Sequence, residues 1–81
     1  MKRSRFDLLA YLLETARNST TKTRIVSQWS QDPKLIDDSL SLLTNLGLLS
    51  ETHNSPVSYV ATQKGLQLLS DYSRLREQLS L

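Results

Sequence analysis

The amino-acid sequence predicts a mainly α-helical domain that carries one small β-hairpin and a long C-terminal helix. Three observations support this fold class. Apolar residues recur at helical spacing in three segments before residue 48. Residues 48–62 change to strand-forming types that flank a polar turn. The last segment carries two apolar stripes, and one of them is longer than the core of an 81-residue chain can cover.

We expect the first helix to run from Ser4 to Arg17, because apolar residues form one stripe along it. Ser4 is of a type that caps helix N-termini, and residues 18–20 are predicted to form a loop. Tyr11 lies off the main stripe, which leaves it available for contact with a second subunit. The stripe expected to face the core consists of Phe6, Leu9, Leu13 and Ala16, widened by Leu8 and Leu12.

A shorter second helix is expected over residues 21–30, with Thr20 or Thr21 as its N-cap. Its buried face would consist of Ile25, Val26 and Trp29. Lys22 and Arg24 lie in its first turn, beside free backbone N–H groups. Such a helix end favours a phosphate group, and the alternative is a solvated helix start without a ligand.

The third helix has the clearest sequence signals. Asp32 is a good N-cap residue, and Pro33 fits the first helical position. Gly47 is a natural C-terminal stop in the left-handed conformation. The apolar stripe between them contains Ile36, Leu40 and Leu43. We therefore expect Leu40 and Leu43 to be buried.

Residues 48–62 predict a two-stranded hairpin with its tip at residues 53–56. A final helix then begins near residues 62–65 and continues to the C-terminus. Its shorter stripe, Leu66 and Leu69, can cover the core of the domain. Its longer stripe has heptad-like spacing, which is typical of a helix that pairs with another chain. This expected dimer seam consists of Leu68, Tyr72, Leu75 and Leu79.

Composition excludes several functional classes. The chain has no Cys and only one His, so we expect no metal site, no cofactor and no Ser-His-Asp catalysis. It has no glycine-rich phosphate loop and no apolar run long enough to cross a membrane. We therefore expect a binding protein rather than an enzyme, located in the cytoplasm and associated with the nucleoid.

The basic residues are concentrated towards the N-terminus. Residues 1–24 contain six basic and two acidic residues, whereas residues 25–81 contain four basic and six acidic ones. The first few positions form a basic arm of Lys2, Arg3 and Arg5. A cationic end of this kind favours a polyanionic partner such as DNA, and the alternative is a solubilising basic tail.

Three helices followed by a hairpin is the element order of a winged helix-turn-helix domain. In that arrangement the third helix lies in the major groove and the hairpin is the wing. We assign residues 1–62 to this domain and residues 63–81 to a dimerisation helix.

Three stretches of the sequence are similar to those of a known protein family. They are residues 21–25 (TKTRI), residues 43–49 (LTNLGLL) and residues 59–69 (YVATQKGLQLL). With these stretches, residues 6–79 resemble a family of small archaeal winged-helix proteins. The resemblance implies a chromatin-like or regulatory DNA-binding protein that pairs through an antiparallel coiled coil of its C-terminal helices.

Basic character and resemblance together give an expected DNA-binding surface. Its residues are Arg3, Arg5, Lys22, Thr23, Arg24, Lys34, Asp37, Asp38, Ser41, Asn45, His53 and Lys64. Asp37 and Asp38 depart from the family pattern, because carboxylates repel a phosphate backbone, although Asp can accept a hydrogen bond from cytosine N4. The expected partners are double-stranded DNA and a second copy of the chain. The alternative is a protein-interaction module that binds a protein partner through the acidic third helix.

Overall fold

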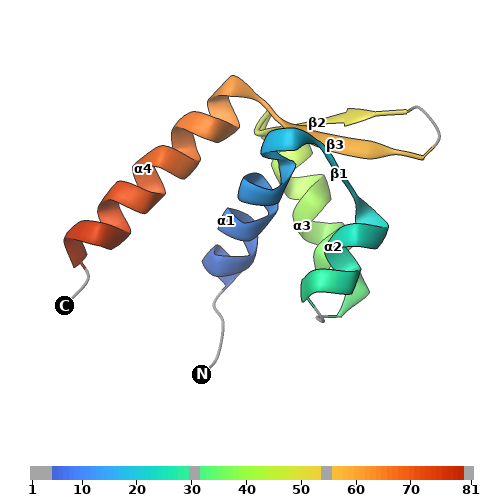
Figure 1. The fold of residues 1–81 in the computed structure, drawn as a ribbon, viewed down its shortest axis with the longest axis horizontal. Coiled ribbons are helices and arrows are strands. Elements are labelled where there is room, and N and C mark those ends of the chain that lie inside the picture. The colour runs from blue at the N-terminus through green and yellow to red at the C-terminus, as the bar shows by residue number, and fades with distance from the viewer. Residues whose placement is uncertain (1–4, 30–31, 54–55, 80–81) are drawn as a thin grey trace.

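The computed structural model describes residues 5–29, 32–53 and 56–79. It has the predicted fold class, with mostly helical structure and a small antiparallel sheet (Figure 1). The helices are α1 (Arg5–Thr15), α2 (Lys22–Trp29), α3 (Pro33–Asn45) and α4 (Gln63–Leu79), with a short 3-10 helix at Ala16–Asn18. The strands are β1 (Thr20–Thr21), β2 (Leu49–Thr52) and β3 (Ser58–Ala61). None of the helices in the described part of the chain is long and apolar enough to cross a membrane.

The sheet has three strands in the order β1-β3-β2. Strands β2 and β3 form the predicted hairpin, and the third strand, β1, was not predicted. The added strand β1 lies in the segment that the sequence indicated as a loop and helix start. Ser19 has a positive φ of 67°, which turns the chain after the 3-10 helix. Thr20 then pairs with Tyr59 of β3. A strand of two residues is too short to show alternation in the sequence, which is why the pattern missed it.

The core lies between the helices and one face of the sheet. Its largest fully buried apolar side chains are Leu8, Leu12, Ile25, Ile36 and Leu43, and Leu13, Trp29, Leu40 and Leu69 are also buried. Leu40 and Leu43 therefore have the predicted burial. Phe6 does not, because its side chain is 70% exposed. The apolar residues of α1 cover more than one face, and the face built on Leu8 and Leu12 is the one that packs inward.

The predicted helix ends are largely confirmed. Thr21, one of the two N-cap candidates, accepts a hydrogen bond through Oγ1 from the Arg24 backbone N–H at 3.3 Å. Asp32 accepts from the Lys34 N–H at 3.0 Å, and proline occupies the first turn behind it. Gly47 has the left-handed φ of 77°. The predicted cap at Ser4 lies outside the described residues.

The start of α4 is clamped onto the end of α3. Thr62 Oγ1 accepts from the Gly65 N–H at 3.1 Å and donates to the Gly47 carbonyl at 2.7 Å. Lys64 Nζ donates to the Leu46 carbonyl at 3.1 Å. A Cβ added to Gly65 would lie 2.1 Å from the Leu48 carbonyl oxygen, so only glycine allows this approach. The Thr62-Gln63-Lys64-Gly65 stretch is thus explained by packing of the chain on itself.

Two contacts differ from the sequence-based expectation. The Tyr11 ring lies 4.7 Å from the Trp29 ring, and its hydroxyl donates to Gln28 Oε1 at 2.6 Å, so Tyr11 joins α1 to α2 within the chain. Leu66 is 37% exposed, whereas Leu69 is buried. Leu69 alone therefore provides the core contact that was expected from both residues.

Candidate nucleic-acid interface

Helix α3 has one buried and one exposed face. Ile36, Ser39, Leu40 and Leu43 are buried, whereas the opposite face exposes Lys34, Asp37, Asp38, Ser41 and Asn45. These five exposed residues are the α3 positions that the sequence placed on the DNA side. The structure therefore brings them together on one helix face that is free of the core. Helices α2 and α3 lie on the side of the domain away from the C-terminal end of α4 (Figure 1).

The first turn of α2 lies beside this face. Thr23 and Arg24 are exposed there. Lys22 does not project freely, because its Nζ forms an ion pair with Asp37 Oδ1 of α3 at 2.5 Å. Both side chains stay about half exposed, at 44% and 51%. The ion pair joins the two helices of the helix-turn-helix, a contact that the sequence did not predict.

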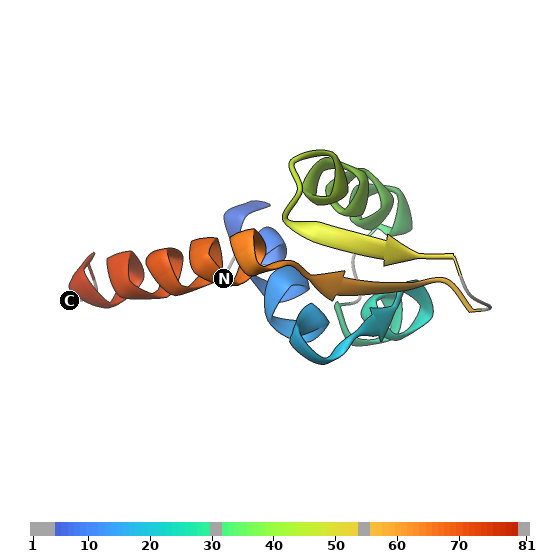
Figure 2. The ribbon, with the colours of Figure 1, turned by 90° about the horizontal axis from the view of Figure 1, so that it is seen from above.

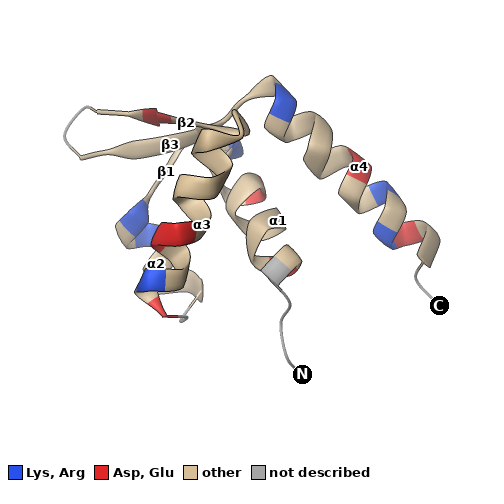
Figure 3. Cartoon of the chain, turned by 180° about the vertical axis from the view of Figure 1, so that it is seen from behind, with Lys and Arg blue, Asp and Glu red and all other residues tan. Residues whose placement is uncertain are grey.

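Residues 20–45 contain three basic and three acidic residues. Figure 3 shows basic and acidic segments together where α2 and α3 lie. Because this part of the chain has no net charge, any attraction for a polyanion depends on how the individual charges are placed. Arg24 and Lys34 are the two exposed basic residues here that have no ion pair within the described part of the chain.

The wing adds a second group of polar residues. His53 follows the last residue of β2, and its side chain is 81% exposed, with its Nδ1 3.5 Å from Glu51 Oε2. Glu51 pairs with Tyr59 across the sheet. Burial raises the pKa of the Tyr59 phenol, and the charges of Glu51 and Asp37 raise it further, while Lys22 lowers it. The wing strands and the Lys22–Asp37 pair are therefore close enough to interact electrostatically.

Lys64 lies at the opposite end of α3 from Lys34. Lys64 is bound to the Leu46 carbonyl at the C-terminal end of α3, about 18 Å along the helix from Lys34 at 1.5 Å per residue. Arg5 is the first residue of α1. Arg3 lies outside the described residues. The structure therefore brings the predicted residues of α2 to the first turns of α3, whereas Lys64 lies at the other end of that helix, where Asn45 also lies.

The predicted dimer seam lies on α4, whose C-terminal end extends away from the domain (Figures 1 and 2). Leu68, Leu75 and Leu79 are exposed, and Leu79 reaches 68%. Tyr72 is half-buried and donates through its hydroxyl to Asp7 Oδ1 of α1 at 3.1 Å. Burial and this hydrogen bond raise the pKa of Tyr72.

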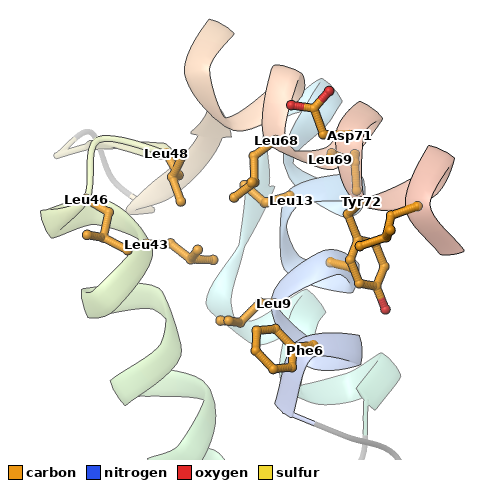
Figure 4. Close-up of a pocket in the computed structure, with 12 residues that line it drawn as sticks. Phe6, Leu9, Leu13, Leu43, Leu46, Leu48, Leu68, Leu69, Asp71 and Tyr72 are labelled. Atoms are coloured by element: carbon orange, nitrogen blue, oxygen red, sulfur yellow. The ribbon is translucent and has the colours of Figure 1, made fainter.

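An apolar groove of about 320 Å³ continues from this seam onto α1 and the end of α3 (Figure 4). Phe6, Leu9, Leu46, Leu68 and Leu75 are among the side chains that line it. Phe6 and Leu46 were not predicted to line a groove. The available signal was that α1 has more apolar residues than one core-facing stripe can use.

The comparisons with known proteins agree with this architecture. The winged helix-turn-helix family matches residues 2–80. The chain belongs to this family. One similar solved structure is Sco5413, a MarR family transcriptional regulator from Streptomyces coelicolor, with a TM-score of 0.77 and 17% sequence identity. The match covers 93% of this winged-helix chain and 54% of the regulator, so the chain spans about half the length of that protein. No curated protein matches it.

Proposed function

We propose that this winged-helix protein binds double-stranded DNA, as a transcriptional regulator or a nucleoid-associated protein. The observation that carries the proposal is the exposed polar face of α3, which has the cationic first turn of α2 beside it. Thirteen residues make α3 about 20 Å long. The major groove of DNA is wide enough to admit an α-helix such as this one. The similarity in fold to a MarR family transcriptional regulator supports the same proposal.

The side chains of the surface fall into two groups by chemistry. Thr23, Arg24 and Lys34 are exposed donors that suit phosphate oxygens, which fix the position of a protein on DNA without reading sequence. Ser41 and Asn45 lie further along α3 and suit base edges, because Asn can form two hydrogen bonds with adenine. Asp38 can accept from cytosine N4. In this proposal His53 lies on the wing and contacts the flanking backbone.

The proposal includes a homodimer formed through α4. Leu68, Leu75 and Leu79 are exposed on the helix, and the groove beside them extends onto Phe6 and Leu46. A two-fold dimer needs a surface that is complementary to itself, and this chain has both an apolar groove and a projecting apolar helix. The dimer would place two copies of α3 on one DNA duplex, as in two-fold helix-turn-helix proteins.

A salt titration tests the DNA-binding proposal. Fluorescence anisotropy with a labelled random duplex would measure affinity at several salt concentrations for the parent, Arg24→Gln and Arg74→Gln. Both arginines are exposed, but Arg74 lies on α4, away from the proposed surface. We expect Arg24→Gln to weaken binding and to flatten the slope of log affinity against log salt by about 0.9 per subunit. Arg74→Gln should keep the parent slope. Equal slopes for all three proteins, or no binding by the parent, would contradict the proposal.

A further inference from the structure

We propose that Asp37 limits the affinity of the protein for DNA by holding Lys22 in an ion pair, for which a DNA phosphate must compete. This inference rests on the proposed function, because it concerns the same α2–α3 surface. It gives one of the two unusual carboxylates a defined role.

Asp37 and its neighbour Asp38 differ in their ion pairing. Both side chains are exposed on the same face of α3. Asp37 Oδ1 lies 2.5 Å from Lys22 Nζ, whereas Asp38 forms no ion pair within the described part of the chain. Two adjacent carboxylates with the same charge therefore differ in what they contact. The chain offers one as a matched control for the other.

The ion pair is placed where it can act on DNA binding. It connects the first turn of α2 to α3, which are the two elements that the proposed function brings to the duplex. While Lys22 is paired, its charge is cancelled locally, so the amine neutralises no phosphate and releases no counterion. A phosphate that approaches Lys22 also approaches the Asp37 carboxylate, and like charges repel.

The ion pair is also weak enough to be displaced. Its partners are 44% and 51% exposed, and ion pairs with this exposure contribute little to stability because water and salt screen them. A DNA phosphate can therefore take Lys22 from Asp37 when the rest of the surface holds the duplex in register. Poorly fitting duplexes provide less of that support. The pair thus weakens binding to random DNA more than binding to a duplex with a good fit.

Nearby residues of the wing are consistent with this arrangement. Burial and the charges of Glu51 and Asp37 raise the pKa of the Tyr59 phenol, while the charge of Lys22 lowers it. Tyr59 pairs with Thr20 of β1, two residues before Lys22, and with Glu51 of β2. The sheet register thus fixes where Lys22 begins α2, next to the wing. The Lys22–Asp37 ion pair therefore lies where α2, α3 and the wing meet.

The test compares Asp37→Asn with Asp38→Asn, each in the parent and in a Lys22→Gln background. Affinity for a labelled random duplex would be measured by anisotropy at 50 mM and 200 mM salt. We expect Asp37→Asn to bind more tightly than Asp38→Asn at 50 mM. Its advantage should shrink by about 3.5-fold per subunit at 200 mM, because one more phosphate contact adds about 0.9 to the salt slope. In the Lys22→Gln background the two Asn variants should bind alike.

The outcomes distinguish this inference from the function on which it rests. Equal gains for Asp37→Asn and Asp38→Asn in the parent would mean that both acids act only through general repulsion, and would overturn the ion-pair role while leaving DNA binding in place. The ion-pair role would also be overturned if Asp37→Asn still bound DNA more tightly than Asp38→Asn in the Lys22→Gln background. If the parent and every variant fail to bind DNA, the proposed function itself is wrong, and this inference falls with it. Far-UV circular dichroism would check that the substitutions at Lys22, Asp37 and Asp38 leave the helical fold intact.

Discussion

Replacing Gly65 with Ala tests the packing of α4 on α3, because helix propensity and tertiary structure predict opposite signs. Alanine is favoured over glycine inside a helix by about 1 kcal/mol. In this structure, however, the added Cβ would lie 2.1 Å from the Leu48 carbonyl oxygen and 3.1 Å from Leu13 Cδ2. Carbon and oxygen atoms in close contact are usually about 3.3 Å or more apart, so α4 or Leu48 would have to move by about 1 Å.

That movement would disturb the hydrogen bonds of the junction. The Leu48 carbonyl accepts from the Thr62 N–H at 3.1 Å, and Thr62 Oγ1 donates to the Gly47 carbonyl at 2.7 Å. Overpacking in a rigid site costs about 1–3 kcal/mol, and each lost hydrogen bond adds about 1 kcal/mol. After the gain from helix propensity, we expect Gly65→Ala to lower the free energy of unfolding by about 2 kcal/mol.

Urea unfolding followed by circular dichroism would measure this change at one fixed protein concentration, because a dimer is stabilised by mass action. Gly47→Ala is the matched control, because Gly47 is needed for its backbone conformation and not for close packing. It has open space around the added Cβ but a φ of 77°, so it should cost about 1–2 kcal/mol. Ser73→Ala on the exposed side of α4 should change stability by less than about 0.5 kcal/mol. A Gly65→Ala protein at least as stable as the parent would refute the close approach.

Further changes test the core, the helix cap, the α1–α4 contact and the dimer. Leu40→Ala should cost about 2–5 kcal/mol in urea unfolding because Leu40 is 2% exposed, and a cost near zero would mean that α3 is wrongly oriented. Thr62→Ala should cost about 1 kcal/mol through loss of the cap on α4, and an unchanged unfolding midpoint would contradict that role. Burial and a hydrogen bond to α1 raise the pKa of Tyr72 above its ordinary 10.0, so its contribution to stability is present below pH 10 and lost as pH rises through the folded-state pKa. Tyr72→Phe should therefore flatten the alkaline part of the stability profile, and an identical profile would argue against the contact. Leu75→Glu should convert the proposed dimer to monomer in sedimentation equilibrium, whereas Leu66→Glu should leave the protein dimeric, and a dimer that survives Leu75→Glu would exclude the α4 seam.

Local signals in the sequence predicted the parts of the fold that local chemistry determines. Asp32, Pro33 and Gly47 mark the ends of α3 through capping and backbone geometry, and the structure has α3 between them. In α3 the apolar stripe of Ile36, Leu40 and Leu43 follows helical spacing along one face, and this is the face that is buried. In α1 the apolar residues surround the helix, so periodicity could not tell that Leu8 faces inward and Phe6 outward.

Features that depend on distant residues could not be predicted in the same way. Strand β1 exists because Thr20 reaches β3, nearly forty residues later in the sequence. The Lys22–Asp37 ion pair depends on how α2 lies against α3, and the sequence alone gave Lys22 only a position in a helix start. Lys64 was predicted to contact DNA from its charge, and its hydrogen bond to the Leu46 carbonyl depends on how α4 packs on α3. Charge and spacing therefore indicated which helices carry these residues, but not which groups their side chains contact.

Mapping where DNA binds on the folded protein tests directly whether α3 is the DNA-binding helix. Two-dimensional ¹H–¹⁵N NMR spectra recorded during titration with a duplex would report on each backbone N–H. We expect the largest chemical-shift changes in the first turn of α2, at Thr23 and Arg24, and along the exposed face of α3, at Ser41 and Asn45. The C-terminal half of α4 should change little. Changes confined to the apolar groove around Phe6 and Leu46, with α2 and α3 unaffected, would contradict the proposal that α3 is the DNA-binding helix.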